Sequence, residues 1–288
     1  MTASDSSAAV TAAPARAPLL RGLIEVSNVC AKDCRYCGIR RGNRSLVRYH
    51  MTVDEVLACA DEAIRRGYPA IALQAGEIES ESNTAFYEEV LGRLPPGLEV
   101  TLSLGEQAED VYRRWKSAAG GRVLRYLLRI ESSSREIYAR LHPADCSFDR
   151  RLECLRTLKR LGYVTGSGVL IGVPGQTTDD LRRDVDFFVA ERMDMVGMGP
   201  YVPHPASPLP GDVPPPEARL RLALAMIREV RRRMPRINIV AATALEALAP
   251  GRGRDLGLRA GANVVMPDLT PERYRERYDL YPGKSSAR

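Results

Sequence analysis

The 288-residue sequence lacks several features that mark particular classes of protein. No stretch approaches the roughly 20 apolar residues of a membrane-spanning helix, so no contact with a membrane is expected. The N-terminal region has no secretory signal, that is, no charged start followed by an apolar stretch and a cleavage site. Because structural disulfides belong to oxidising compartments, the six cysteines are expected to be unpaired and the protein to be cytoplasmic.

Aromatic residues are also scarce, at 6%, and they do not interleave with the basic residues as they do in nucleic-acid-binding modules. The formal net charge of +6 comes from 42 Lys and Arg against 36 Asp and Glu. Arginines fall along presumed helix faces, as at residues 231–233, so this charge is interpreted as solvated surface and no nucleic-acid partner is expected. The 44% hydrophobic and 27% charged residues are those of an ordinary globular protein.

Three cysteines, Cys30, Cys34 and Cys37, lie within eight residues, directly after an apolar run that ends at residue 26. Three thiolates can hold three irons of a cubane cluster, whereas a closed four-iron cluster needs a fourth protein ligand that this segment does not supply. One iron would stay open for chemistry. The segment therefore predicts a catalytic 4Fe-4S cluster.

The alternatives for the cysteines are weaker. A tetrahedral zinc site needs a second Cys or His pair at a partner spacing, and His50 is a solitary candidate. Cys59 and Cys154 fall on helical patterns, where a free cysteine packs as a small apolar residue. Cys146 is predicted to lie in a loop and has no assigned role.

Short apolar runs alternate with longer segments of helical period, which is typical of βα units around a parallel sheet. Eight such runs predict a (β/α)8 barrel of the TIM type between residues 19 and 284. Residues 1–18 are predicted to be a disordered tail, because Ala, Ser, Thr and Pro cannot bury enough apolar surface, and residues 285–288 are predicted to fray. The runs span residues 23–26, 70–74, 99–104, 125–131, 165–173, 195–202, 238–244 and 263–269. Helical patterns span residues 52–66, 108–118, 148–161, 177–192 and 216–234, and the connection after the seventh run is the least helical.

Polar and glycine-rich groups follow each run, as expected if they converge on the carboxyl ends of the barrel strands, where such barrels place their active sites. Glycines alone are usually turn residues, and single polar residues at strand ends are often helix caps. Here all eight strand ends carry such groups. Beyond the cysteine segment they are residues 74–77 and 103–106, Arg129 and Glu131, residues 172–176 and 200–205, Thr243 and residues 266–268.

The cysteine spacing, with Tyr36 just before the last cysteine, resembles the signature of radical S-adenosylmethionine (SAM) enzymes, whose open iron chelates SAM. From residue 23 to 284 the sequence is similar to the radical SAM maturase of FeFe-hydrogenase, the HydE family, within the biotin synthase and methylornithine synthase group. The segments that carry this resemblance are residues 25–28, 37–41, 101–106, 126–129, 173–177, 194–200 and 281–284.

This resemblance implies a role for each matching residue. Cys30, Cys34 and Cys37 would ligate the cluster, Tyr36 would pack near the adenine, and Glu131 would hydrogen-bond SAM. Arg151 would pair with the methionine carboxylate, as a guanidinium fork suits. Residues from Gln74 through Gly76 to Glu77 would meet the methionine amino group, and Gly172 would belong to the cofactor-binding turn.

The resemblance also implies a substrate and partners. The family's substrate is a small cysteine-bound iron carbonyl cyanide unit, a precursor of the hydrogenase diiron cofactor. Other maturation proteins and an electron donor would be partners, and an oxygen-sensitive cluster would require anaerobic conditions. The residues that match the family's substrate cavity are Arg129, Thr243, Met266, Tyr278 and Tyr281.

Other interpretations stay open. A methylornithine synthase-like mutase uses the same barrel, and a non-catalytic iron–sulfur scaffold would keep the cysteines without turning over SAM. Biotin synthase fits less well, because its second cluster needs cysteines inside the barrel.

Single residues also have alternative interpretations. Glu131 and Arg151 could form only an ion pair at the barrel rim, and Tyr278 and Tyr281, three apart, could be core packing on a terminal helix. His204, between two prolines, could be a rigid-loop residue or a substrate contact.

The sequence departs from the family pattern at several points. It shows neither a helical extension before the first strand nor a cysteine-bearing tail after residue 284, so no second cluster is expected. Ile130 is apolar where a polar residue is expected, and Ala75 replaces a small hydroxyl residue. These departures concern the substrate more than the SAM chemistry.

Overall fold

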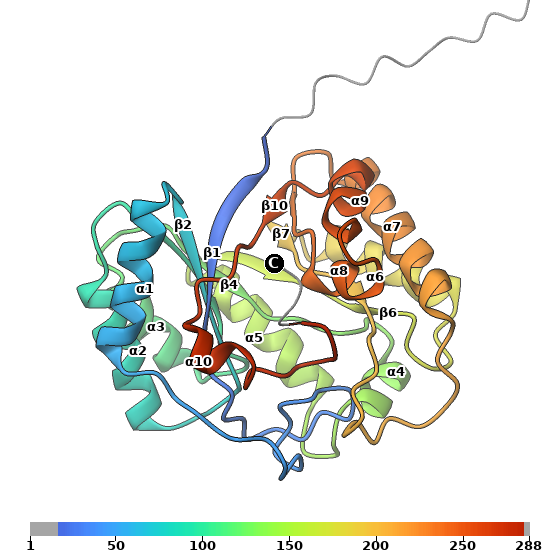
Figure 1. Ribbon diagram of the computed structural model, residues 1–288, viewed down its shortest axis with the longest axis horizontal. Helices are drawn as coiled ribbons and strands as arrows, with labels where there is room; N and C mark the ends of the chain where they lie inside the picture. The colour runs from blue at the N-terminus through green and yellow to red at the C-terminus, as the bar shows by residue number, and fades with distance from the viewer. Residues whose placement is uncertain (1–16, 285–288) are drawn as a thin grey trace, which may run out of the picture.

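A computed structural model describes residues 17–284 (Figure 1). The frayed C-terminus predicted at residues 285–288 and nearly all of the predicted N-terminal tail therefore lie outside the described residues. Within the described part of the chain, no helix is both long and apolar enough to cross a membrane.

The centre of the fold is a parallel β-barrel. Eight strands are hydrogen-bonded in the order β10-β1-β2-β3-β4-β5-β7-β9. The two edge strands meet through a parallel bridge between Val240 and Val264, where Ala241 N donates to Val264 O at 2.9 Å. This closure confirms the predicted (β/α)8 barrel. The strands are β1 (Leu19–Ser27), β2 (Ala70–Ala75), β3 (Glu99–Ser103), β4 (Leu124–Leu127), β5 (Val164–Ser167), β7 (Met195–Val196), β9 (Asn238–Ile239) and β10 (Val264–Val265).

Two of the predicted strands are interrupted. The runs at 165–173 and 195–202 each break, and their second halves, β6 (Leu170–Ile171) and β8 (Gly199–Pro200), form a separate two-stranded sheet. At the break the main chain of Glu131 replaces the ladder, because Glu131 N donates to Gly168 O and Leu170 N donates to Glu131 O, both at 3.0 Å. Parallel pairing therefore continues past the break, through the Glu131–Val169 bridge and the β6–β8 sheet.

The five predicted helices are present, and capping boxes explain two of their starts. Thr52 and Thr177 form capping boxes with Glu55 and Asp180, which satisfies free N–H groups of the first turn. The predicted helices are α1 (Val53–Arg65), α3 (Glu109–Ala118), α5 (Phe148–Arg160), α6 (Thr178–Ala190) and α7 (Pro216–Arg233). The helices that were not predicted are α2 (Glu81–Arg93), α4 (Arg135–Leu141), α8 (Thr243–Leu248), α9 (Gly253–Ala260) and α10 (Glu272–Arg275). Two of these, α8 and α9, fill the connection after the seventh run, so the expectation of least helix there was wrong.

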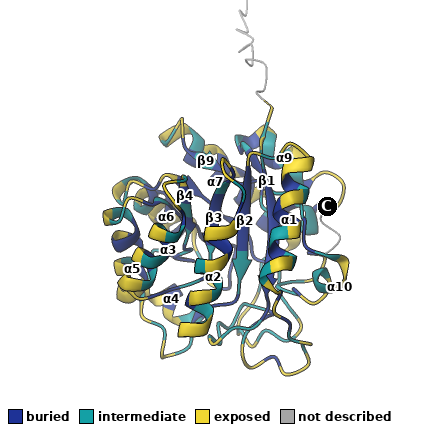
Figure 2. Ribbon diagram, turned by 90° about the vertical axis from the view of Figure 1, so that its left-hand side faces the viewer, coloured by how far each residue is buried: buried dark blue, intermediate teal, exposed yellow. Residues whose placement is uncertain are grey.

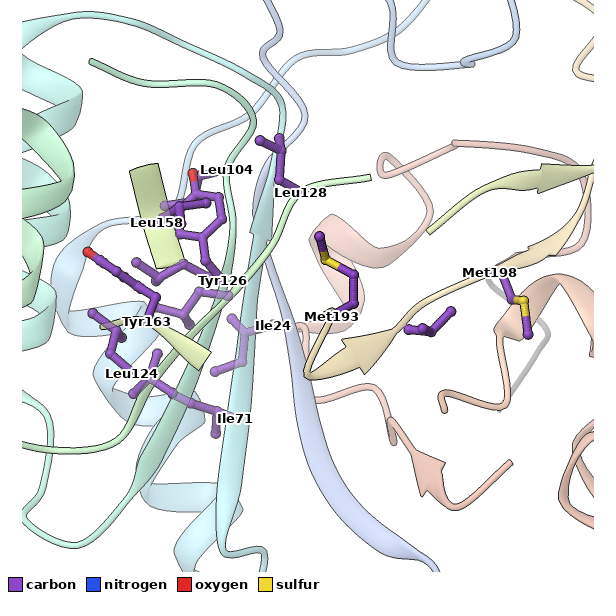
Figure 3. Close-up of a cluster of buried hydrophobic side chains, with 14 of the residues drawn as sticks. Ile24, Ile71, Leu104, Leu124, Tyr126, Leu128, Leu158, Tyr163, Met193 and Met198 are labelled. Atoms are coloured by element: carbon purple, nitrogen blue, oxygen red, sulfur yellow. The ribbon is translucent and has the colours of Figure 1, made fainter. Parts of the chain in front are cut away.

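The hydrophobic core lies between the barrel and the surrounding helices (Figure 3), and the strands are buried while the outer helix faces are exposed (Figure 2). Trp115 is central to this layer, with the rings of Tyr87 and Tyr126 at 5.6 and 6.5 Å from its own. Along β1 the side chains alternate: Ile24 is part of this core, whereas Leu23 lines the barrel interior. Alternate residues of each strand are thus available for a site inside the barrel.

Candidate active site at the barrel mouth

A cavity of about 270 Å³ opens at the carboxyl ends of the strands. It is bounded by the loop after β1, by the strand ends and by the C-terminal segment, residues 276–284. All of the site residues predicted from the sequence line it except Gly172: Cys30, Cys34, Tyr36, Cys37, Gln74, Gly76, Arg129, Glu131, Arg151, Thr243, Met266, Tyr278 and Tyr281. Residues far apart in sequence therefore meet at one mouth.

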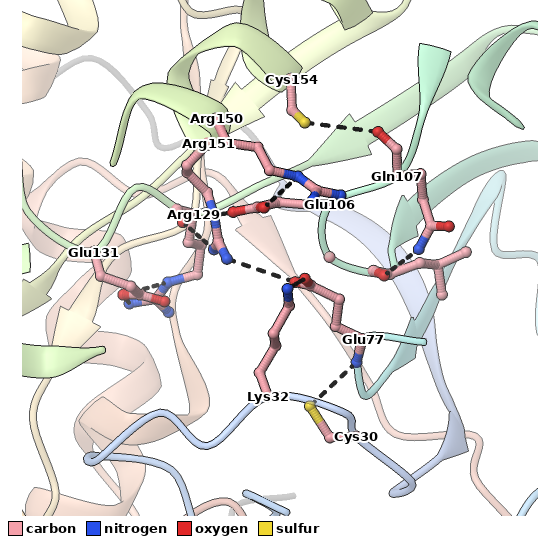
Figure 4. Close-up of polar contacts among 12 residues, drawn as sticks. Cys30, Lys32, Glu77, Glu106, Gln107, Arg129, Glu131, Arg150, Arg151 and Cys154 are labelled. Carbon is pink, nitrogen blue, oxygen red and sulfur yellow. Dashed lines mark hydrogen bonds and ion pairs between the residues drawn. The ribbon is translucent and has the colours of Figure 1, made fainter. Parts of the chain in front are cut away.

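The loop that follows β1, residues 28–50, is fixed in place by main-chain contacts. Ala31 N donates to Glu77 O at 2.8 Å, and Glu77 N donates to Cys30 Sγ at 3.3 Å (Figure 4). Gly76 has to be glycine, since a Cβ there would lie 2.2 Å from Val29 O. The guanidinium of Arg48 donates to main-chain carbonyls on both sides of the loop, at distances from 2.6 to 3.1 Å. We call this segment the cluster loop.

The three predicted ligands suit a cubane cluster better than a single ion. Among residues 17–284 no three His, Cys, Asp or Glu side chains converge on one metal position, as a tetrahedral zinc site requires. Cys30, Cys34 and Cys37 instead line one side of the cavity, and a cubane takes its thiolates on separate irons. Burial raises the pKa of Cys37 to about 12, so this thiol stays protonated until a metal displaces the proton.

A charge network lies beside the cluster loop (Figure 4). Arg151 Nε contacts Glu106 Oε1 at 2.6 Å, and its Nη2 lies 3.5 Å from Glu77 Oε2. Burial alone would lower the pKa of Arg151, but the carboxylates of Glu77 and Glu106 raise it well above its usual range. On the outer side, Lys32 Nζ lies 3.2 Å from Glu77 and Arg150 Nε lies 3.2 Å from Glu106. The network therefore holds the Arg151 guanidinium at the cavity wall.

Glu131 adopts an unusual backbone conformation. Its φ of 63° is in the left-handed region, which costs a residue other than glycine roughly 1–3 kcal/mol. The conformation directs its carboxylate to Arg129 at 2.9 Å and to the hydroxyl of Tyr36 at 3.3 Å. Asp184 holds the following turn, because its Oδ1 accepts from both the N–H and the hydroxyl of Ser133 at 2.6 and 2.7 Å. The alternative of a Glu131–Arg151 ion pair is wrong, since each pairs with other residues.

The C-terminal segment supplies the opposite wall. Tyr278 and Tyr281 line the cavity but follow α10, which ends at Arg275, so the terminal helix considered for them is absent. Tyr281 hydrogen-bonds to Thr243, and burial raises its pKa to about 12. Next to them, Lys284 reaches into the barrel and pairs with Glu25 of β1.

Sequence reasoning missed several residues of the site. Lys32 and Lys284 line the cavity, although the sequence showed them only as parts of the cysteine and C-terminal segments. One signal in the sequence could have predicted an ion pair at Glu25. Glu25 lies within an apolar run expected to be buried, and a buried carboxylate calls for a buried cation. Arg151 was predicted, but its partner Glu106 appeared only as a strand-end residue.

Other singled-out residues lie outside the cavity. Gly172, with φ of 79°, is a turn residue packed against Arg219, and its predicted cofactor contact stays a prediction. His204 bonds to Asp279 at 2.9 Å and does not line the cavity, which agrees with a rigid-loop residue. Cys146 lies in a loop and its thiol contacts that of Cys34. Cys59 and Cys154, which were expected to pack as small apolar residues, are both buried.

Comparisons with known proteins agree with this geometry. Residues 24–188 match the Radical SAM superfamily. The chain is 45% identical to the FeFe-hydrogenase maturase subunit HydE of Thermotoga maritima over 92% of this chain and 74% of that protein. It is 26% identical to 3-methylornithine synthase of Methanosarcina barkeri, covering 88% of this chain and 70% of that protein. The fold is similar to that of the maturase HydG from Carboxydothermus hydrogenoformans, with a TM-score of 0.74, 21% identity, and coverage of 88% of this chain and 59% of that one.

Proposed function

Because the chain belongs to the radical SAM superfamily, and within it to the family of the FeFe-hydrogenase maturase subunit HydE, we propose that it makes an adenosyl radical and uses it on a small precursor of the hydrogenase diiron cofactor. One observation carries this proposal. The residues that the family resemblance assigns to the cluster, to SAM and to the substrate line a single cavity, with Gly172 as the exception.

Members of this superfamily bind a 4Fe-4S cluster and SAM. When bound, these groups supply reductive cleavage of the sulfonium carbon–sulfur bond, which yields methionine and a 5′-deoxyadenosyl radical. Cys30, Cys34 and Cys37 would hold the cluster. The protein's contribution is to orient SAM beside these thiolates and to keep water away from the radical.

The SAM-binding part of the cavity has donors and acceptors in suitable places. Arg151 has two guanidinium N–H groups beyond its contacts with Glu106, Glu77 and the Arg129 carbonyl, and within residues 17–284 no hydrogen bond engages them, so they could bind a carboxylate. Glu77, whose main-chain N–H donates to Cys30 Sγ, lines the cavity, and its carboxylate would attract an ammonium group. Glu131 is aimed into the cavity by its backbone and would accept hydrogen bonds from SAM hydroxyls.

The substrate would occupy the part of the cavity lined by Arg129, Thr243, Met266, Tyr278 and Tyr281. An arginine, two phenols and a threonine hydroxyl offer donors to cyanide and carboxylate groups, and Met266 offers an apolar surface. This combination suits a cysteine-bound iron carbonyl cyanide unit. An external electron donor and other maturation proteins would be partners, in the cytoplasm and under anaerobic conditions.

The test compares two candidate substrates. Cluster-loaded protein is incubated anaerobically with SAM and dithionite, and 5′-deoxyadenosine is measured with a synthetic cysteine-bound iron carbonyl cyanide complex or with lysine. We expect the iron complex to accelerate SAM cleavage and to be consumed. Acceleration by lysine alone would favour a methylornithine synthase-like mutase. A cluster that binds SAM and never cleaves it would leave only the scaffold.

A further inference from the structure

The positive charge of this chain is concentrated in the cluster loop, residues 28–50. The loop holds six Lys and Arg against one Asp, an excess of five, whereas the other 265 residues hold 36 Lys and Arg against 35 Asp and Glu. Arginines do fall along helix faces, as expected, but outside the cluster loop acidic residues balance nearly all of the basic ones. At residues 231–233, for example, Arg232 pairs with Glu229 and Arg233 with Asp186.

Within the cluster loop, the cations divide into two groups. Four of them serve the fold: Lys32 pairs with Glu77, Arg40 pairs with Asp33, and both Arg35 and Arg48 donate to main-chain carbonyls. Two others, Arg41 and Arg44, are exposed, and neither side chain makes an ion pair or hydrogen bond with another described residue. Arg41 helps to lower the pKa of Asp33, but Asp33 is already paired with Arg40, so both arginines leave positive charge facing solvent.

An apolar side chain accompanies these two arginines. Val47, three residues after Arg44, is 62% exposed, whereas the other large hydrophobics on the described surface are about 45% exposed. A contact surface between proteins that combines arginine with an apolar centre is more typical than one of charge alone. We call Arg41, Arg44 and Val47 the basic face of the cluster loop.

The basic face lies directly behind the predicted cluster ligands. Arg41 N donates to Lys32 O at 2.8 Å, and Arg40 N donates to Cys37 O at 3.3 Å, so the backbone next to Arg41 is tied to the cysteine segment. The thiols themselves line the cavity on the inner side of the same loop. With SAM and substrate in the cavity, an external electron carrier would meet the cluster loop from its outer side.

From this arrangement, and resting on the function proposed above, we propose that the basic face is the docking site of an acidic one-electron carrier protein. The reduced carrier gives up one electron and the cluster takes it up. Unpaired arginines steer an acidic partner into place over about a Debye length, and Val47 contributes the desolvated centre of the contact.

The experiment reverses the charge of the basic face. Arg41→Glu/Arg44→Glu is compared with wild type and with Arg221→Glu/Arg228→Glu, a control of the same charge change at exposed positions of α7 that make no ion pair with a described residue. Each cluster-loaded protein receives either a reduced flavodoxin of acidic isoelectric point or dithionite. The readouts are 5′-deoxyadenosine formation and the Kd of the oxidised flavodoxin from calorimetry.

We expect the loop variant to lose about tenfold in kcat/KM for flavodoxin and in flavodoxin affinity at low ionic strength, with dithionite-driven cleavage unchanged. The loss should fade near 1 M ionic strength, where the Debye length is about 3 Å. The α7 control should stay within about twofold of wild type.

Two results would overturn the docking site. One is a loop variant with wild-type flavodoxin kinetics, affinity and salt dependence. The other is a loop variant that loses only binding to a single-stranded oligonucleotide, which would make the basic face a nucleic-acid contact. Failure of the proposed function is distinguishable, because wild-type protein would then fail with dithionite as well.

Discussion

At the scale of single residues, Glu131 is the clearest case of a side chain placed by backbone strain. Its left-handed φ persists because the main chain bonds to Gly168 and Leu170 and because Asp184 holds the next turn. Nothing in the local sequence of Glu131 signals a positive φ, and the family resemblance, not a turn motif, singled it out. Strain of this kind is stored where function needs a fixed geometry.

Glu131→Gln tests whether the carboxylate binds SAM. A charge-assisted hydrogen bond contributes about 1.5–3 kcal/mol, so we expect at least a tenfold weaker Kd for SAM, measured by calorimetry on the cluster-loaded protein. The matched control is Glu136→Gln, at an exposed carboxylate of α4. Equal SAM affinity in both variants would remove Glu131 from the SAM site.

Asp184 makes stability depend on pH. Burial raises its pKa from 3.8 to about 6. Because the folded pKa lies above the unfolded one, the stabilising contribution is full below about pH 4 and is lost as pH rises through 6, by about 3 kcal/mol. Urea unfolding of the cluster-free protein should show this loss, and Asp184→Asn should not. An unchanged pH profile in Asp184→Asn would contradict the assignment.

At the scale of elements, the sequence predicted what depends on local pattern. Helices with clear amphipathic period and a Thr cap, such as α1 and α6, were predicted to within about two residues. The short helices α4 and α8 were not predicted, because they have too few turns for a helical period to appear in the sequence. The break between β5 and β6 lies where Val169 pairs with the distant Glu131, which no local pattern contains.

The cluster loop depends on Gly76 of the segment after β2. Gly76→Ala would push a Cβ to 2.2 Å from Val29 O and 2.7 Å from Cys30 Cβ, so we expect it to lose most of its iron after reconstitution. Gly92→Ala on α2 is the matched control, because a Cβ there meets nothing within 4 Å and alanine favours a helix by about 1 kcal/mol. Iron content and visible absorption give the readout. Normal cluster loading in Gly76→Ala would show that the loop moves freely against β2.

At the scale of the whole molecule, the cavity is completed by a segment that lies more than 200 residues from the cluster loop in the sequence. The Lys284–Glu25 pair joins the C-terminal segment to β1 inside the barrel. The sequence predicted the barrel, because repeated βα units allow few arrangements, and all of the site residues that the family resemblance assigned, except Gly172, line the cavity. It could not predict which cation meets Glu25 or Glu106, because those pairings follow from tertiary packing.

Lys284→Met tests this closure. Removing the cation leaves Glu25 buried without a partner, so we expect a loss of about 3–5 kcal/mol in unfolding free energy. The loss should shrink at acid pH. In the variant the unpaired, buried Glu25 carboxyl has a raised pKa, and it destabilises the folded state less once it is protonated. Glu25→Gln/Lys284→Met should recover much of the stability. Denaturant unfolding of the cluster-free proteins checks all three, and a Lys284→Met variant as stable as wild type at pH 8 would contradict the pairing.

The central claim is that Cys30, Cys34 and Cys37 hold a cluster that drives SAM cleavage. The most direct measurement is anaerobic iron–sulfur reconstitution of wild type and Cys34→Ala, followed by reduction with SAM and assay of methionine and 5′-deoxyadenosine. We expect equal amounts of both products from wild type and none from Cys34→Ala. A wild-type cluster that binds SAM without cleaving it, or stoichiometric zinc in place of a cluster, would contradict the account.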